Sequence, residues 1–150
     1  MSPGTHGIPH RALLLCEPLS ARLGAEAVAD ALTAGLRAGG APEPDAILLP
    51  AQMDDRETGA LLERERFHER MRASRAVVLA VPALREETLA GGAAFEIATR
   101  ARQSGVPCYA VAASVERNAF DLRILDLQKV VEARGTATLE RAGELLAAVI

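Results

Sequence analysis

The chain has 150 residues, of which 49% are hydrophobic and 25% charged, a composition that excludes a disordered chain and suits one domain with a single core. Its net charge of −3 provides no basic field that would attract nucleic acid, and an aromatic content of 3% leaves few rings for stacking on bases. No apolar run approaches the roughly 18 residues that a membrane-spanning helix needs, so we expect no membrane insertion.

The first ten residues, MSPGTHGIPH, contain two prolines, two glycines and two histidines without any periodicity. This composition predicts a loose N-terminal arm over residues 1–10, followed by a single domain over residues 11–150. The same segment lacks the apolar core of a signal peptide, so we expect the chain in the cytoplasm.

Strand-like and helix-like segments alternate along the rest of the chain. A continuous apolar run at 12–16 predicts a buried strand, and an apolar stripe from Leu23 to Gly35 predicts a helix that stops at Gly39 and Gly40. Further apolar runs predict strands, and an alternating run predicts an edge strand. Between them, apolar residues at helical spacing predict helices. In chain order these are strand 45–50, helix 57–74, strand 76–84, helix 86–103, strand 106–114, edge strand 120–125 and helix 136–150.

Apolar runs without alternation are typical of strands that are buried on both faces of a parallel sheet. Joined by helices, they predict right-handed βαβ units and an α/β fold class: a three-layer Rossmann-like domain with four or five mostly parallel strands. Ligands of such sheets bind beyond the carboxyl ends of the strands. We therefore expect a ligand site among the loops at 17–23, 50–57, 81–92 and 114–118.

Residues that commonly bind metals or act as nucleophiles are sparse. Cys16 and Cys108 lie in apolar runs without metal-ligand spacing, so we interpret both as buried core thiols. His68 lies between Glu65 and Glu69 in a charged helical segment, which favours a solvated role. The residues alone therefore indicate no metal site and no cofactor.

The first predicted loop and helix resemble the opening of the glycerate kinase family, D-S-F-K-G-S-L-S-A followed by an alanine-rich helix that ends in G-L. A second stretch, LLPAQMDDRETG at 48–59, is similar to the family's L-P-x-A-D-G-G-E-G-T. A third, at 79–114, is similar to the family's T-G-E-G-R-L-D-x-Q-T-L-x-G-K-x-P segment and the helix and strand that follow it. Residues that match the family are Leu23, Ala25, Val28, Ala29, Ala31, Gly35, Leu36, Pro50, Thr58, Leu84, Thr88, Leu89, Gly91 and the GVP at 105–107.

The polar positions of the family pattern differ in this chain. Glu17 stands in place of an aspartate, whereas Ser20 and Gly92 stand in place of lysines. Arg85 stands in place of an aspartate, which reverses the charge at that position. The further replacements are Met53 for an aspartate, Arg56 for a glutamate, Val81 for a glutamate and Ala83 for an arginine. The family's second domain, inserted between the second and third stretches, is also absent, and only ALLERERFHERMRA bridges that interval.

The resemblance implies the Rossmann-like half of a glycerate kinase with most of its catalytic groups replaced. Phosphoryl transfer depends on cations, Mg²⁺ and the carboxylates that hold the metal. We therefore expect a degenerate relative that does not transfer phosphoryl groups and acts as a binding or interaction module, as a homodimer or with another protein. One alternative is an ATP- and Mg²⁺-dependent kinase of glycerate or a similar small hydroxy acid, completed by a partner chain. Another is a remnant of the family without an activity.

A remnant anion or nucleotide site is a further hypothesis, because arginine side chains and exposed N–H groups suit phosphate. The competing interpretation is that Gly91 and Gly92 form only a turn and that Arg85 is a solvated loop residue. The candidate site residues are Glu17, Ser20, Arg22, Asp54, Asp55, Arg85, Thr88, Gly91 and Gly92.

Overall fold

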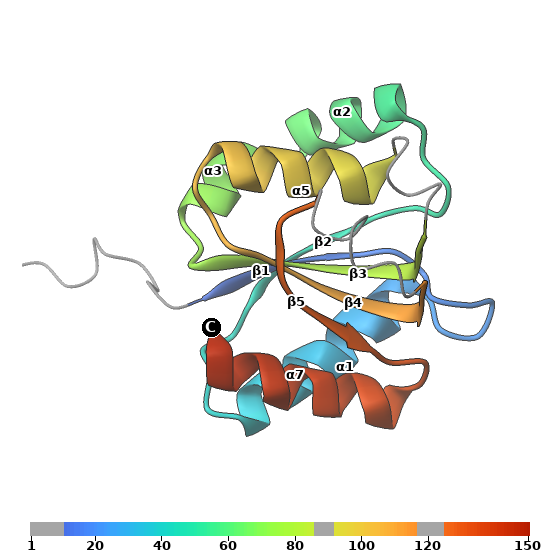
Figure 1. Ribbon diagram of the computed structural model, residues 1–150, viewed down its shortest axis with the longest axis vertical. Coiled ribbons are helices and arrows are strands. Elements are labelled where there is room, and N and C mark those ends of the chain that lie inside the picture. The colour runs from blue at the N-terminus through green and yellow to red at the C-terminus, as the bar shows by residue number, and fades with distance from the viewer. Residues whose placement is uncertain (1–10, 86–91, 117–124) are drawn as a thin grey trace, which may run out of the picture.

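The computed structural model describes residues 11–85, 92–116 and 125–150. Within these ranges, five parallel strands form one sheet in the order β2-β1-β3-β4-β5, and helices cover both of its faces (Figure 1). The α/β three-layer Rossmann-like fold predicted from the sequence is therefore confirmed. The elements are β1 (Ala12–Cys16), α1 (Ala25–Ala38), β2 (Asp45–Leu48), α2 (Asp55–Arg64), α3 (Phe67–Arg72), β3 (Ala76–Leu84), α5 (Ala93–Gln103), β4 (Cys108–Val115), β5 (Leu127–Glu132) and α7 (Thr136–Val149).

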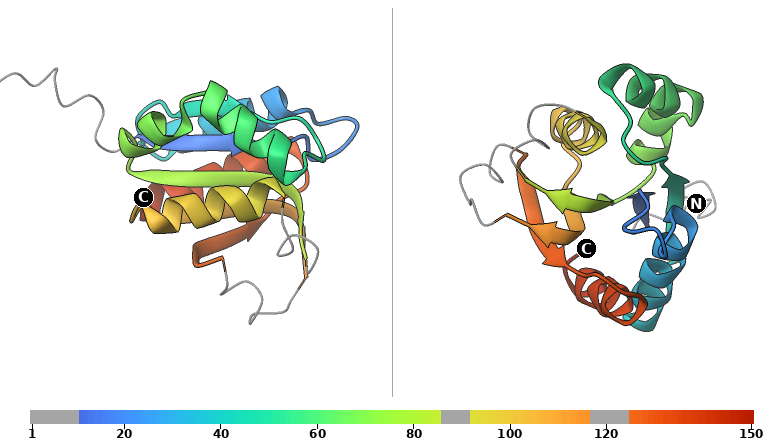
Figure 2. Two further views of the ribbon diagram at one scale, coloured as in Figure 1. Left: turned by 90° about the horizontal axis from the view of Figure 1, so that it is seen from above. Right: turned by 90° about the vertical axis from the view of Figure 1, so that its right-hand side faces the viewer.

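The core consists of two apolar layers, one on each face of the sheet. Helices α2, α3 and α5 cover one face, and α1 and α7 cover the other (Figures 1 and 2). Successive side chains of a strand point to opposite faces, so Leu13 and Leu15 enter the first layer while Leu14 and Cys16 enter the second. All four are inaccessible to solvent. This double burial explains why the strand reads as one unbroken apolar run.

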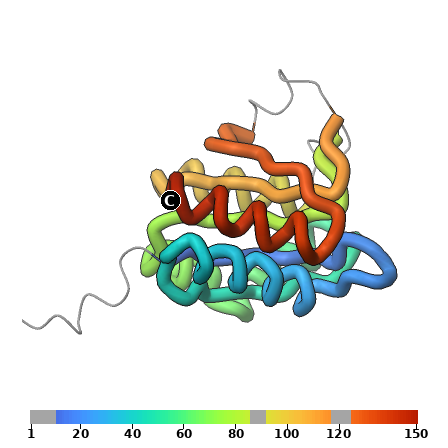
Figure 3. Tube along the Cα trace, turned by 90° about the horizontal axis from the view of Figure 1, so that it is seen from below, coloured from blue at the N-terminus to red at the C-terminus, as the bar shows by residue number. Residues whose placement is uncertain are grey.

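Helices α1 and α7 lie side by side across one face (Figure 3) and approach closely at Gly35 and Gly143. A Cβ atom placed on Gly35 would lie 1.9 Å from the carbonyl oxygen of Glu140, and one on Gly143 would lie 2.5 Å from that of Leu32. Two glycines thus let the helix backbones come into contact, which larger side chains would prevent.

The fifth strand lies later in the chain than the sequence predicts. Residues 120–124 of the predicted edge strand are outside the described residues, and Leu125 and Asp126 form a turn. The strand that completes the sheet is β5, which pairs with β4 as an edge strand. Its sequence, LQKVVE, mixes half-buried with exposed side chains and therefore lacks the apolar run that marks the buried strands.

Three other predicted boundaries change. The predicted helix 57–74 is two helices, because Arg66 between α2 and α3 adopts a left-handed conformation with φ of 58°. The strand predicted at 45–50 ends at Leu48. Helix α5 begins at Ala93 rather than near residue 86, with residues 86–91 outside the described ranges. The arm predicted at residues 1–10 also lies outside them.

Candidate functional site

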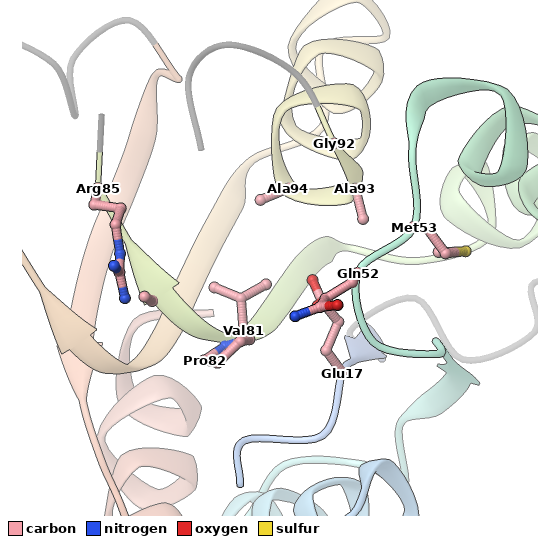
Figure 4. Close-up of a pocket in the computed structure, with 10 residues that line it drawn as sticks. Glu17, Gln52, Met53, Val81, Pro82, Arg85, Gly92, Ala93 and Ala94 are labelled. Carbon is pink, nitrogen blue, oxygen red and sulfur yellow. The ribbon is translucent and has the colours of Figure 1, made fainter. Parts of the chain in front are cut away.

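A cavity of about 500 Å³ lies beyond the carboxyl ends of β1 and β2, alongside the carboxyl-terminal half of β3 and next to the first turn of α5 (Figure 4). This is the edge of the sheet at which the sequence places a ligand site. Its lining residues come from three loop regions, the end of β3 and the first turn of α5. They are Glu17, Gln52, Met53, Val81, Pro82, Ala83, Arg85, Gly92, Ala93 and Ala94.

Glu17 is held at the cavity by its backbone. It directly follows β1, and its N–H group donates a 2.9 Å hydrogen bond to the carbonyl oxygen of Ala80 in β3. On the other side of β1, the N–H of Leu49 donates to the carbonyl oxygen of Cys16 at 2.8 Å. These bonds continue the sheet past the end of β1, so Glu17 has a fixed backbone and a side chain that meets the cavity.

The carboxyl group of Glu17 is half-buried. Burial raises its pKa from 4.5 to about 7. Across residues 11–85, 92–116 and 125–150, the structure contains no hydrogen bond or ion pair from this carboxyl group. Near neutral pH the group therefore exists in both protonation states. The protonated carboxyl group can donate a hydrogen bond, and the ionised carboxylate can form an ion pair with a cation.

Arg85 brings a positive charge to the same cavity. It follows the last residue of β3, and Figure 4 shows its side chain across the lining from Glu17 and Gln52. The wall between them is formed by Val81 and Pro82 of β3. An acid and a guanidinium thus border the same space, with apolar side chains between them.

Asp54 and Asp55, two of the candidate site residues, have structural roles and do not line the cavity. Asp54 caps α2: its Oδ1 accepts a 2.8 Å hydrogen bond from the N–H of Glu57, whose Oε1 accepts from the N–H of Asp54. Asp55 Oδ1 accepts a 2.7 Å hydrogen bond from the N–H of Gly92, which links α2 to the start of α5. Gly92 has φ of 92°, a conformation that favours glycine.

Ser20 and Arg22 are exposed members of the turn that follows β1, and neither lines the cavity. The N–H of Arg22 donates to Ser20 Oγ at 3.3 Å, and the N–H of Leu23 donates to the Ser20 carbonyl oxygen at 3.2 Å. The turn is thus closed by its own groups.

Of the nine residues proposed from the sequence, the structure brings Glu17, Arg85 and Gly92 together at the cavity. Thr88 and Gly91 lie outside the described residues. Among the other seven lining residues, the sequence marked Met53, Val81 and Ala83 only as replacements of polar family residues, and it did not single out Gln52, Pro82, Ala93 and Ala94. Five of these seven lie within the loops at 50–57 and 81–92, which the sequence predicts to border a ligand site. Their position after a strand was therefore the available sign of a role in the site. Most of them are apolar residues, however, and such residue types do not by themselves indicate binding.

Among the described residues, no group of three or more His, Cys, Asp or Glu side chains could hold a metal ion. Within the same part of the chain, no helix combines the length and apolar character needed to cross a bilayer. Cys16 and Cys108 are buried, and burial raises the pKa of each thiol to about 12, so neither acts as a thiolate at neutral pH.

The family model described as the glycerate kinase family matches residues 15–148 of the chain. No curated protein and no solved structure gives a significant match. The match extends from the end of β1 to the last turn of α7 and thus includes every residue of the cavity lining.

Proposed function

Because the chain belongs to the glycerate kinase family, we propose that it retains a ligand-binding cavity of that fold without phosphoryl-transfer chemistry. It binds a small polar molecule at the carboxyl ends of β1, β2 and β3. The observation that carries this proposal is the lining of the cavity, where Glu17 and Arg85 are the charged side chains among ten described residues.

The cavity suits a small ligand in size and in character. Binding sites for small molecules commonly enclose about 300–1,000 Å³ and place a few polar groups on an apolar wall. Here the volume is about 500 Å³, the wall includes Val81, Pro82 and Ala83, and the polar side chains are Glu17, Gln52 and Arg85. In such a lining the polar side chains orient a ligand, and the wall makes apolar contact with it.

Phosphoryl transfer requires groups that the described residues of the lining do not supply. The reaction needs cations and Mg²⁺ to neutralise charge on the transferred group, and carboxylates to hold the metal. Asp54 and Asp55 are engaged in capping α2 and in anchoring Gly92. Losing one well-placed electrostatic group typically costs about 2.7–4 kcal/mol of barrier, and several are replaced here.

Family membership also favours a second candidate, an ATP-dependent kinase of glycerate or a related hydroxy acid. In that case a partner chain would supply the missing domain and, with it, the further cations that the reaction needs besides Arg85. A partner of this kind would carry a basic surface that fits over the cavity opening.

The test combines a ligand-dependent thermal shift with an assay for ADP formation. The panel contains D-glycerate, phosphate, and ATP with Mg²⁺, applied to the native chain, to Arg85→Gln, and to Arg56→Gln as the control. Arg56 is an exposed residue of α2 that does not line the cavity. A ligand at 100 times its dissociation constant should add about 2.7 kcal/mol of stability.

We expect a carboxylate ligand to stabilise the native chain and Arg56→Gln but not Arg85→Gln, with no ADP formed. ADP formation that requires D-glycerate and the intact chain would overturn the proposal in favour of the kinase. Equal thermal shifts in both variants would show that the ligand binds elsewhere.

A further inference from the structure

The chemistry of the cavity indicates which class of small molecule it accepts, an inference that rests on the proposed binding function. We infer that the ligand is a small zwitterion, with a primary ammonium group at Glu17 and a carboxylate toward Arg85. An α-amino acid is the simplest molecule of this class. A hydroxy acid of the same size lacks the positive charge that Glu17 would recognise.

The first argument is the isolation of the Glu17 carboxyl group. The hydrogen bond from its N–H group to Ala80 of β3 fixes the backbone of Glu17, and this holds the side chain at the cavity. No hydrogen bond or ion pair from a described residue satisfies the carboxyl group, and burial raises its pKa to about 7. A carboxylate that is partly removed from water without a partner is unfavourable. A ligand ammonium group would supply the missing charge.

The second argument is the pairing of opposite charges across one small space. Arg85 stands across the lining from Glu17, and the other eight described lining residues are uncharged (Figure 4). A zwitterion matches this distribution at both ends. A phosphate monoester or dicarboxylate would instead place a second negative charge near Glu17 and be repelled as that group ionises.

Ionisation of Glu17 also sets a pH dependence. Its surroundings within the lining are Gln52 and Met53 from the β2–α2 loop, the first residues of α5, the end of β3, and Arg85 directly after β3, the one other charged group of the ten. With a pKa of about 7, Glu17 is about one-tenth ionised at pH 6 and about nine-tenths ionised at pH 8. Affinity for an ammonium ligand should therefore rise about tenfold over this interval. Affinity for a plain anion should fall.

The probes are serine and glycerate of the same configuration, which differ by an ammonium group against a hydroxyl group on the second carbon. Isothermal titration calorimetry at pH 6, 7 and 8 measures the affinity of both for the native chain, Glu17→Gln and Arg56→Gln. Repeating the titration at pH 7 in two buffers of different ionisation enthalpy measures the protons released on binding.

We expect the native chain and Arg56→Gln to prefer serine, to bind it about tenfold more tightly at pH 8 than at pH 6, and to release about half a proton at pH 7. Glu17→Gln should lose all three properties and still bind glycerate. Glycerate binding equal to or tighter than serine binding would overturn the zwitterion inference and leave the proposed binding function in place. Absence of binding by serine, glycerate and the other panel ligands would overturn both.

Discussion

Replacement of Glu17 by glutamine tests whether the cavity holds its acid in the neutral form. The pKa of Glu17 is raised by burial from 4.5 to about 7. Between these two values the folded chain keeps the proton that the unfolded chain releases, so the free energy of unfolding decreases as pH rises. The decrease begins near pH 4.5 and is complete above about pH 7. Glutamine stays neutral in both states and carries no such dependence.

The size of the effect follows from the same two values. One pKa unit corresponds to about 1.4 kcal/mol, so the full difference amounts to about 3 kcal/mol. Water reaches the exposed edge of the side chain through the cavity and lowers the free-energy difference below this upper limit. The difference in unfolding free energy between Glu17→Gln and the native chain should therefore grow from near zero at pH 4 to about 1–3 kcal/mol at pH 8. For a chain of this length that is several degrees in Tm.

The assay is thermal or urea unfolding of the native chain and Glu17→Gln at pH 4, 5, 6, 7 and 8. Glu63→Gln is the control, because Glu63 is an exposed residue of α2 and its removal changes the net charge equally. A difference between the native chain and Glu17→Gln that stays constant from pH 4 to pH 8 would refute the reasoning. So would an equal pH dependence in Glu63→Gln.

Three further predictions concern the scaffold and the assembly. Gly35→Ala should lower the free energy of unfolding by about 3 kcal/mol or more in urea titrations, because its Cβ would lie 1.9 Å from the Glu140 carbonyl oxygen. Gly59→Ala, inside α2 with a nearest neighbour at 3.8 Å, should instead raise it by about 0.5–1 kcal/mol, and equal effects would contradict the packing argument. Asp45→Asn should destabilise the chain at pH 7 by about 1–3 kcal/mol in the same titrations, because Asp45 and Arg70 form a half-buried ion pair at 2.7 Å. The pair lowers the pKa of Asp45, so its contribution is present above the unfolded-state pKa and is lost as pH falls through the lower folded-state value; a difference that persists at pH 2 would contradict this. Light scattering should give twice the chain mass of 15.8 kDa, with Leu145 and Val149 of α7 exposed as apolar contacts, and a monomer at high concentration would oppose the predicted homodimer.

Much of the scaffold follows from local sequence. Strand β1 could be predicted because all five of its side chains are buried on one face or the other, which leaves an unbroken apolar run. Strand β5 could not be placed, because an edge strand keeps exposed side chains such as Lys129 among its half-buried valines. The break between α2 and α3 was also missed, because it depends on the left-handed backbone conformation of Arg66, which an arginine in the sequence does not indicate.

The candidate site divides in the same way. The sequence by itself predicted that a ligand site would lie at the carboxyl ends of the parallel strands, and it named Glu17, Arg85 and Gly92, which the structure brings to one cavity at those ends. Only the tertiary structure decided that Asp55 is engaged elsewhere, since the bond from Gly92 to Asp55 joins residues 37 positions apart. Asp54, in contrast, caps its own helix through a local bond to Glu57. Only the tertiary structure, too, places Glu17 half-buried at the cavity without a described partner for its carboxyl group. Periodicity and motifs record which residues are neighbours along the chain, whereas charge, burial and pKa depend on neighbours in space.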